Sequence, residues 1–227
     1  MKLTHRDMRL IRDVALSHVL SRDQLLELGY FGSATRLNAR LRELRKEGYV
    51  VVCATPFFGQ HLYMAGRRAP KIVGERIASI LSGRNPSPRF IQHALATTST
   101  RIALVDAGCT EWRFETQLRH SFSYGGRFLE IRPDGMVRRD GRLTVLEIDM
   151  GHVDPHKYGQ KLKGYEAFAE SGELKRVWGE DHLDVLTVSV GTLRRIRLTR
   201  RAPSNPLNCF SFLTFDDLGV KVAGGWS

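Results

Sequence analysis

The sequence predicts an α+β protein in two parts: a helical N-terminal third that ends in a β-hairpin, and a longer α/β domain built on a mixed central sheet. Three observations support this prediction. Apolar residues recur at helical spacing through the first 47 positions. Residues 49–64 are rich in β-branched and aromatic side chains around a Pro/Gly turn, which is typical of a hairpin. Beyond residue 112, strand-like runs flank a helical segment, as in mixed sheets.

Three helices are predicted in the N-terminal third, each opened by a capping side chain. Thr4, Ser21 and Ser33 are the capping residues, because their hydroxyl groups can accept from the free backbone N–H groups of a first helical turn. The second helix is short, covering residues 22–28, and Gly48 ends the third. The hairpin follows at once, so the order is that of a winged helix-turn-helix over residues 1–70.

The third helix is predicted to have two faces. Leu37, Leu41 and Leu44 form a buried stripe, and polar or basic side chains occupy the opposite side. Arg and Asn suit bidentate contacts with base edges, and Lys suits a phosphate. A merely solvated basic face, or a dimerisation module, fits the same pattern. The candidate DNA-binding residues are Thr35, Arg36, Asn38, Arg42 and Lys46 on the helix and Arg67 and Arg68 after the hairpin.

A helical linker is predicted over residues 71–88. A helix covers about residues 71–81, and the Gly/Pro/Ser cluster that follows it is typical of a loop at a domain boundary. The second domain is therefore expected over residues 89–227, starting with a long helix to about residue 105.

Strands and one helix are predicted in the second domain. A strand over residues 142–149 follows the Asp140-Gly141 turn signal, a helix covers residues 156–170, and residues 183–190 form a buried strand. The cationic run 194–201 alternates partly with apolar residues, so it is predicted as an edge strand that either contacts phosphates or is kept soluble by its charge.

Three carboxylates are expected near one another at the ends of two neighbouring strands. Glu147 and Asp149 are two residues apart and therefore share a face of their strand, while Asp134 ends the strand before. Oxygen ligands of this kind suit Mg²⁺ or Mn²⁺ in phosphodiester hydrolysis. The alternative is a pair of solvent-exposed strand ends with ordinary acidic residues. His152 and His156 are a weaker zinc candidate, because Asp154 and Pro155 suit the start of a helix.

The charge of the chain favours a polyanionic partner. The 227 residues carry a formal net charge of +11, which raises the local concentration of nucleic acid, although it also suits solubility or an anionic membrane surface. No apolar run approaches the roughly 20 residues of a membrane span. The first six residues lack the apolar stretch of a signal peptide, so a cytoplasmic location is expected. Three isolated cysteines fit reduced thiols.

The order of these features resembles the plasmid replication-relaxation protein family, with a second domain similar to PD-(D/E)XK nucleases. The resemblance implies a DNA-binding protein of a plasmid or phage, with double-stranded DNA and replication or mobilisation proteins as partners, and covers most of the chain. The features are the winged helix, a junction helix with His93, Trp112 and Glu115, Arg132-Pro133-Asp134, Leu146-Glu147-Ile148-Asp149, and Lys161-Leu162-Lys163-Gly164-Tyr165.

The sequence departs from the nuclease pattern at one position. That pattern has a lysine two residues after the acidic strand residue, where its charge stabilises the developing negative charge, but Asp149 occupies this position. Lys161 is the first candidate to replace the lysine and Lys163 the second, while Glu115 is a further candidate for the metal shell. The predicted catalytic set is thus Asp134, Glu147, Asp149, Lys161 and Glu115, with the first three as metal ligands.

Three functions are compatible with the sequence. The favoured one is a DNA-binding protein of a mobile element with a nuclease-like, degenerate second domain. The others are a metal-dependent DNA endonuclease targeted by its winged helix, and a transcriptional autoregulator that acts as a homodimer. Only Mg²⁺ or Mn²⁺ is considered as a cofactor, with no organic cofactor.

Overall fold

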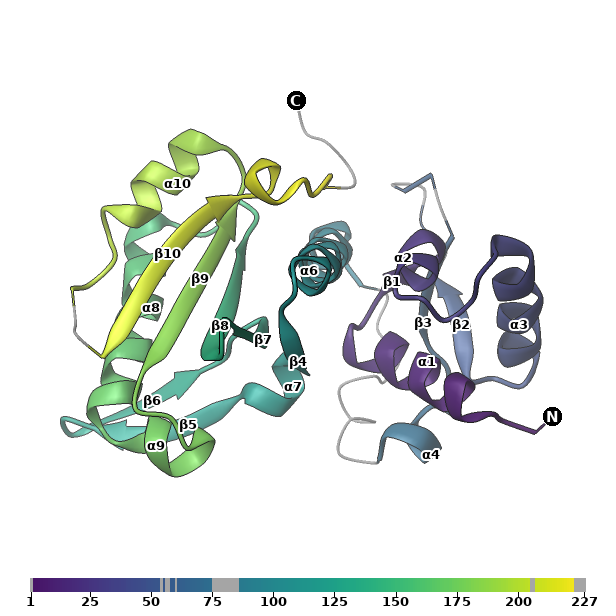
Figure 1. The fold of residues 1–227 in the computed structure, drawn as a ribbon, viewed down its shortest axis with the longest axis horizontal. Helices are drawn as coiled ribbons and strands as arrows, with labels where there is room; N and C mark the ends of the chain where they lie inside the picture. Colours follow the sequence, from purple (N-terminus) through teal and green to yellow (C-terminus); the bar gives the residue numbers. More distant parts are fainter. Residues whose placement is uncertain are drawn as a thin grey trace. The chain divides into compact units, whose positions relative to one another are not determined.

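The computed structural model describes residues 2–53, 55, 58–59, 61–74, 86–204 and 207–222. The chain forms two compact units: unit 1 contains the residues up to Ile102 and unit 2 covers Ala103–Lys221 (Figure 1). The division falls within helix α6 (Pro88–Asp106). Residues 75–85, which make up most of the predicted 71–88 linker, lie outside the described residues. Helix α4 (Pro70–Val73) precedes them.

Unit 1 contains the three helices and the hairpin that the sequence predicts, in the predicted order. Strand β1 adds to the hairpin, so that the described strands form a three-stranded sheet in the order β1-β3-β2 with antiparallel pairs. The elements are α1 (His5–Leu16), β1 (Leu20–Ser21), α2 (Arg22–Glu27), α3 (Ala34–Lys46), β2 (Val50–Cys53) and β3 (Leu62–Ala65).

The caps of unit 1 confirm the predicted helix starts. The Thr4 hydroxyl accepts from the backbone N–H of Asp7, whose carboxylate accepts in return from the N–H of Thr4. Ser21 and Gln24 form the same reciprocal pair at the start of α2. Ser33 caps α3. Each pair satisfies backbone N–H groups that no helical carbonyl can reach, which fixes where the helix begins.

Helix α3 is held on the rest of unit 1 through its apolar stripe and one ion pair. Leu37, Leu41 and Leu44 are buried as predicted, in a core shared with α1, α2 and the hairpin. On the flank of this stripe, Arg40 donates to both carboxylate oxygens of Asp7 in α1, at 2.8 and 2.5 Å. The opposite face of α3 therefore points away from the core.

Unit 2 contains a mixed five-stranded sheet in the order β10-β9-β8-β7-β4, as seen in Figure 1. β8 pairs in parallel with β9 and antiparallel with β7, and β10 pairs in parallel with β9. The protein is thus α+β with a mixed sheet, as predicted. The strands are β4 (Thr110–Phe114), β7 (Gly135–Arg139), β8 (Arg142–Asp149), β9 (Leu183–Ser189) and β10 (Asn208–Thr214), with β5 (His120–Tyr124) and β6 (Arg127–Ile131) in a separate hairpin.

Helix α8 supplies most of the helical side of the unit 2 core. Tyr158, Leu162, Tyr165 and Phe168 of this helix are buried against apolar side chains of the sheet and the β5–β6 hairpin. Asp154 caps α8 and Pro155 is its first residue, so these residues open the helix as predicted. The helices of unit 2 are α7 (Glu115–Leu118), α8 (Pro155–Glu170), α9 (Glu173–Trp178), α10 (Thr192–Thr199) and a 3₁₀ helix (Asp216–Leu218).

The edge strand predicted at 194–201 is wrong, because this segment forms helix α10. Arg194 and Leu198 are four residues apart and both turn inward, Arg194 to a carboxylate and Leu198 into the core. In a helix, residues four apart lie on the same face. In a strand, Arg194 and Leu198 would share their face with the residue midway between them. The strand at this edge of the sheet is β10, which the sequence analysis did not predict.

Candidate nucleic-acid interface and buried acidic cluster

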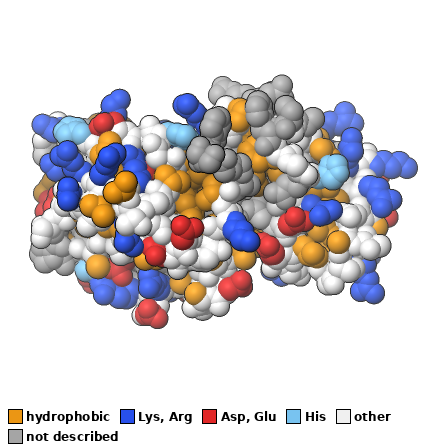
Figure 2. Space-filling view, turned by 90° about the horizontal axis from the view of Figure 1, so that it is seen from above, with side chains coloured by type: hydrophobic (Ala, Val, Ile, Leu, Met, Phe, Trp, Pro, Cys, Tyr) orange, Lys and Arg blue, Asp and Glu red, His pale blue; other side chains and the backbone are white. Residues whose placement is uncertain are grey.

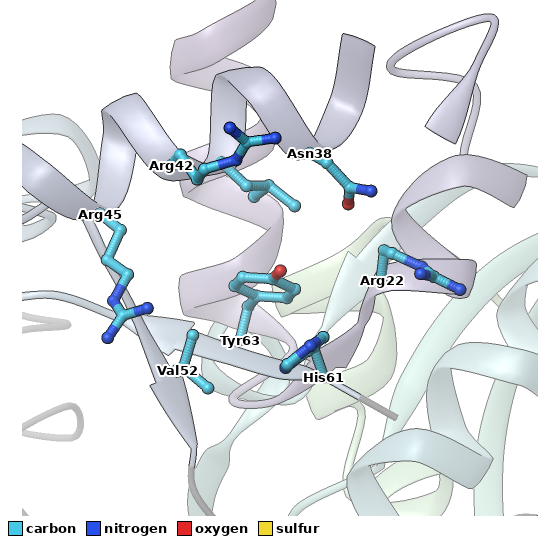
Figure 3. A pocket seen from close by; sticks show the side chains of 8 residues that line it. Arg22, Asn38, Arg42, Arg45, Val52, His61 and Tyr63 are labelled. Carbon is cyan, nitrogen blue, oxygen red and sulfur yellow. The ribbon is translucent and has the colours of Figure 1, made fainter. Parts of the chain in front are cut away.

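The outward face of α3 borders a basic groove in unit 1. The groove has a volume of about 290 Å³. In Figure 3, Asn38 and Arg42 extend from α3 on one side, and Val52, His61 and Tyr63 rise from the hairpin on the other. The residues that line it are Arg22, Asn38, Leu41, Arg42, Arg45, Val52, His61 and Tyr63. Three arginines thus surround a hollow that also offers an amide and a phenol.

The predicted DNA-binding residues of α3 lie on the exposed face of the helix. Thr35, Arg36, Arg42 and Lys46 are exposed, and Asn38 is half-buried at the edge of the groove. Figure 2 shows Lys and Arg side chains gathered at the end of unit 1 that α3 forms in Figure 1. The face that the periodicity predicts to be free is free in the described structure, so these side chains can reach a ligand.

The two arginines after the hairpin differ in their surroundings. Arg67 is exposed. Arg68 contacts the Glu47 carboxylate at 2.8 Å, and its guanidinium lies 4.7 Å from the centre of the Tyr49 ring. Arg68 therefore ties the end of α3 to the hairpin, and Arg67 is the better placed of the two for a phosphate.

Arg22, Arg45 and His61 line the groove but were not among the predicted site residues. Arg22 is the first residue of α2, and His61 lies just before β3. Their sequence positions carry no signal by themselves, because only the packing of α2 and the hairpin against α3 brings them to one groove. Arg45 could have been found, since it follows Arg42 by three residues and therefore lies on nearly the same side of the helix.

The carboxylates predicted in unit 2 are buried rather than exposed. Glu147 and Asp149 lie two residues apart on β8, and their exposed fractions are 1% and 2%. The structure thus contradicts the alternative in which they are solvent-exposed strand ends. Helices α8 and α10 each supply a cation to this part of β8.

Glu147 is held by two side chains of α8. The Lys161 ammonium and the Tyr165 hydroxyl each donate a short hydrogen bond to its carboxylate. Burial raises the pKa of Glu147 to about 7, against the opposing effect of Lys161, and the negative charge of Asp134 adds to the increase. Lys161 is thus where the prediction places it, next to the acidic strand residue.

Asp149 forms a bidentate ion pair with Arg194 of α10. The two guanidinium nitrogens lie 2.6 and 2.8 Å from the two carboxylate oxygens. Arg194 also donates to the backbone carbonyl of Val153. This arginine was not predicted as a site residue, because 45 positions separate it from Asp149 and its segment was predicted to be a strand.

Asp134 lies beside the same cluster but turns to the backbone. Its carboxylate accepts from the N–H of Ile148 at 2.7 Å, and its own N–H donates to the carbonyl of Leu146 at 2.9 Å. The charges of Asp134, Glu147 and Asp149 all raise the pKa of Tyr158, after the larger effect of its burial. The charges of all three carboxylates therefore act on α8. The prediction that Asp134 ends a strand is wrong, because Asp134 lies between β6 and β7, directly before the first residue of β7.

Glu115 and Lys163 contribute less. Glu115 forms an ion pair with Arg132, and its charge raises the pKa of Lys161, although burial of the ammonium opposes that increase. Lys163 is exposed on α8, away from the buried side that Leu162 and Tyr165 share. Of the two predicted lysines, Lys161 is the one that contacts the cluster.

The donor set does not fit a divalent metal as the side chains are arranged. Among the described residues, no three carboxylate, histidine or cysteine side chains are grouped so that they could hold a metal ion. The oxygens of Glu147 and Asp149 already accept from a lysine, a tyrosine and an arginine. Binding of Mg²⁺ or Mn²⁺ by Asp134, Glu147 and Asp149 stays a prediction from the sequence.

A family model described as replication-relaxation matches residues 11–180 of the chain. The chain belongs to the replication-relaxation family. The match includes α3, the hairpin, β8 and α8, so both the basic groove and the acidic cluster lie within the part that this replication-relaxation protein shares with its family. Membership suggests a role in the replication or mobilisation of mobile elements.

Among solved structures, the replication-relaxation protein is similar to the crystal structure of protein VC1899 from Vibrio cholerae. The identity is 12% and the TM-score 0.33, and the similarity covers 96% of this chain and 55% of that one. The chain thus spans about half the length of the structure it matches. No curated protein matches it significantly. None of the helices in the described residues combines the length and apolar character needed to span a bilayer.

Proposed function

We propose that this replication-relaxation protein binds double-stranded DNA through unit 1, as a winged helix-turn-helix in which α3 enters the major groove and the β2–β3 hairpin is the wing. The observation that carries the proposal is the groove of Figure 3, where Asn38 and Arg42 of α3 lie beside Arg22 and Arg45. An α-helix has a width that a major groove accepts, and the free polar face of α3 can then contact base edges.

The side chains of the groove divide into two chemical classes. Asn38 and Arg42 are suited to bidentate hydrogen bonds with adenine and guanine edges, which differ from pair to pair in the major groove. Arg22, Arg45 and the exposed Lys46 are suited to phosphates, which position the protein without selecting sequence. Tyr63 is a buried residue that forms part of the groove floor.

Unit 2 is proposed to be a PD-(D/E)XK-like domain that holds DNA backbone or mediates assembly. Along the chain, α6 precedes β4, β7, β8, α8 and β9, with α7 and the β5–β6 hairpin inserted after β4 and α9 inserted before β9. Apart from these insertions, a helix, three strands, a helix and a strand follow one another, which supports the likeness to that superfamily. The acidic residues lie near β8 as that comparison requires. The finer role within replication or mobilisation depends on the DNA site that unit 1 selects.

The test begins with selection of a binding site from a randomised duplex library, followed by fluorescence anisotropy on the selected duplex and on a scrambled one. Arg42→Ala is expected to weaken binding to the selected duplex about tenfold or more, because one bidentate base contact contributes about 1–3 kcal/mol of discrimination. Binding to the scrambled duplex should change much less.

Arg127→Ala is the matched control, since Arg127 is an exposed arginine of unit 2, outside the groove. This variant should keep the wild-type ratio of affinities for the selected and the scrambled duplex. Equal losses on both duplexes in Arg42→Ala would show that α3 does not contact bases. If the wild-type protein enriches no sequence from the library and does not bind the scrambled duplex, the proposed function itself is contradicted.

A further inference from the structure

We infer that the acidic centre of unit 2 is neutralised by the chain's own cations, Lys161 and Arg194, and that these two side chains exclude a divalent metal from Glu147 and Asp149. The inference does not depend on DNA binding by unit 1. It rests on the contacts that the carboxylate oxygens make, on how the two cations are held, and on the charge that results.

The oxygens of Glu147 and Asp149 are engaged by protein donors. Lys161 and Tyr165 donate to different oxygens of Glu147, and Arg194 donates to both oxygens of Asp149. A metal bound to these oxygens would stand next to an ammonium and a guanidinium. The bidentate contact of Arg194 uses both oxygens of Asp149, so a metal could bind this carboxylate only after the guanidinium has moved away.

Arg194 is the more firmly held of the two cations. The Arg194 side chain is 12% exposed and is fixed by a second hydrogen bond to the Val153 carbonyl. An arginine does not lose its proton in a protein, so its charge stays in the centre at every pH where the protein is folded. Lys161 is 40% exposed and anchored on α8 one turn before Tyr165, which binds the same carboxylate.

The charges of the centre come close to balance without a metal. Asp134, Glu147 and Asp149 bring three negative charges, and Lys161 and Arg194 bring two positive charges. Direct contacts with Lys161 and Arg194 thus offset two of the three negative charges. The centre therefore attracts a doubly charged ion less strongly than three carboxylates without cationic partners would.

The experiment is a titration of the full chain with Mn²⁺, followed by the electron paramagnetic resonance signal of the free ion in the absence of DNA. The wild-type protein is expected to show no saturable binding below 1 mM. The Lys161→Met/Arg194→Met variant is expected to bind one equivalent of Mn²⁺ at least tenfold more tightly, and Asp149→Asn in that background should abolish the gain. Lys175→Met is the control, because it removes a cation from an exposed pair with Asp181.

Each outcome decides. Saturable binding by the wild-type protein that Glu147→Gln removes would overturn the inference, whereas binding that Glu147→Gln leaves unchanged lies elsewhere and leaves the centre metal-free. A double variant that keeps the wild-type circular dichroism spectrum and still binds no Mn²⁺ would show that Lys161 and Arg194 are not what excludes the ion. If the double variant does not fold, the wild-type and Glu147→Gln titrations decide. Because no DNA is present, failure here is separate from failure of the proposed function.

Discussion

Asp7, Glu147 and Asp149 are carboxylates that the fold removes from water, and each meets a cation from another element. Asp7 of α1 meets Arg40 of α3, while α8 and α10 supply the partners of the two β8 residues. Burial of a charge without a partner is costly, so each pair fixes how its two elements dock. In each pair, the contact determines how two elements dock, and this role is more important than its net contribution to the free energy of unfolding.

Removal of the Arg40 guanidinium is predicted to destabilise the protein in a pH-dependent way. Burial opposes ionisation of Asp7, but hydrogen bonds from Arg40 and Thr4 outweigh it and lower its pKa from 3.8 to about 2. The lowered pKa stabilises the fold fully above pH 4, and this contribution is lost as the pH falls through 2. Arg40→Met should therefore lower the free energy of unfolding by about 2 kcal/mol at pH 7 and pH 5, and by less at pH 3.

Urea unfolding of the wild-type protein and of Arg40→Met at these three pH values measures the difference. Arg127→Met, which removes an exposed arginine, is the control and should change the free energy of unfolding little at any pH. A difference between wild type and Arg40→Met that is as large at pH 3 as at pH 7 would show that Asp7 is not the group responsible.

In the elements β7 and α8, the space next to the backbone determines whether a glycine can be replaced by a residue with a side chain. Gly135 begins β7, and a Cβ atom built there would lie 2.4 Å from the Trp112 ring, so the strand and the ring pack only because the side chain is absent. Gly164 lies within α8, where a Cβ atom would meet no atom within 4 Å. One glycine is required by packing, and the other is not.

Alanine at these two glycines is predicted to have opposite effects. Gly135→Ala should lower the free energy of unfolding by about 1–3 kcal/mol, because the half-buried Trp112 ring has to move. Gly164→Ala should raise it by about 0.5–1 kcal/mol, because alanine loses less backbone freedom in a helix. Guanidinium unfolding of both variants checks this pair of signs, and a stabilised Gly135→Ala protein would contradict the packing at Trp112.

Local signals made the three helices and the hairpin of unit 1, and β8, α8 and β9 of unit 2, predictable. The caps of α1, α2 and α3 and the turn at Asp140-Gly141, where both residues have positive φ, depend on neighbours in sequence and were predicted. Helix α10 was not, because over eight residues its cationic pattern fits a strand nearly as well as a helix. Lys161 was predicted from its position on α8, whereas Arg194 reaches Asp149 only through the tertiary fold.

At the scale of the whole molecule, the net charge of +11 is unevenly used. Several cations are consumed by ion pairs inside the units, such as Arg40, Lys161 and Arg194. Arg22 of the groove pairs with the exposed Asp23 at 2.9 Å, whereas Arg42, Arg45 and the cations on the free side of α3 lie at the surface, where a polyanion can reach them. The cations at the surface therefore favour binding of a polyanion, whereas the cations in buried ion pairs hold elements of the fold together.

Binding of DNA is predicted to weaken steeply with salt. If Arg22, Arg36, Arg45, Lys46 and Arg67 each neutralise one phosphate, the logarithm of the association constant should fall with the logarithm of salt concentration at a slope of about −4.5. Lys46→Ala should reduce this slope by about 1 and weaken selected and scrambled duplexes alike. Anisotropy titrations between 50 and 300 mM KCl, roughly the range where counterion release dominates, measure the slope. A slope near zero would contradict the electrostatic account.

The ion pair between Asp149 and Arg194 also constrains the order in which unit 2 can be completed during translation. The β7–β8 hairpin leaves the ribosome well before α10, since 45 positions separate the two partners. Until the later helix emerges, closing the sheet around Asp149 would strand a carboxylate in a dry interior. We therefore expect the sheet to close around Asp149 only after Arg194 has emerged, and strand β10 emerges later still.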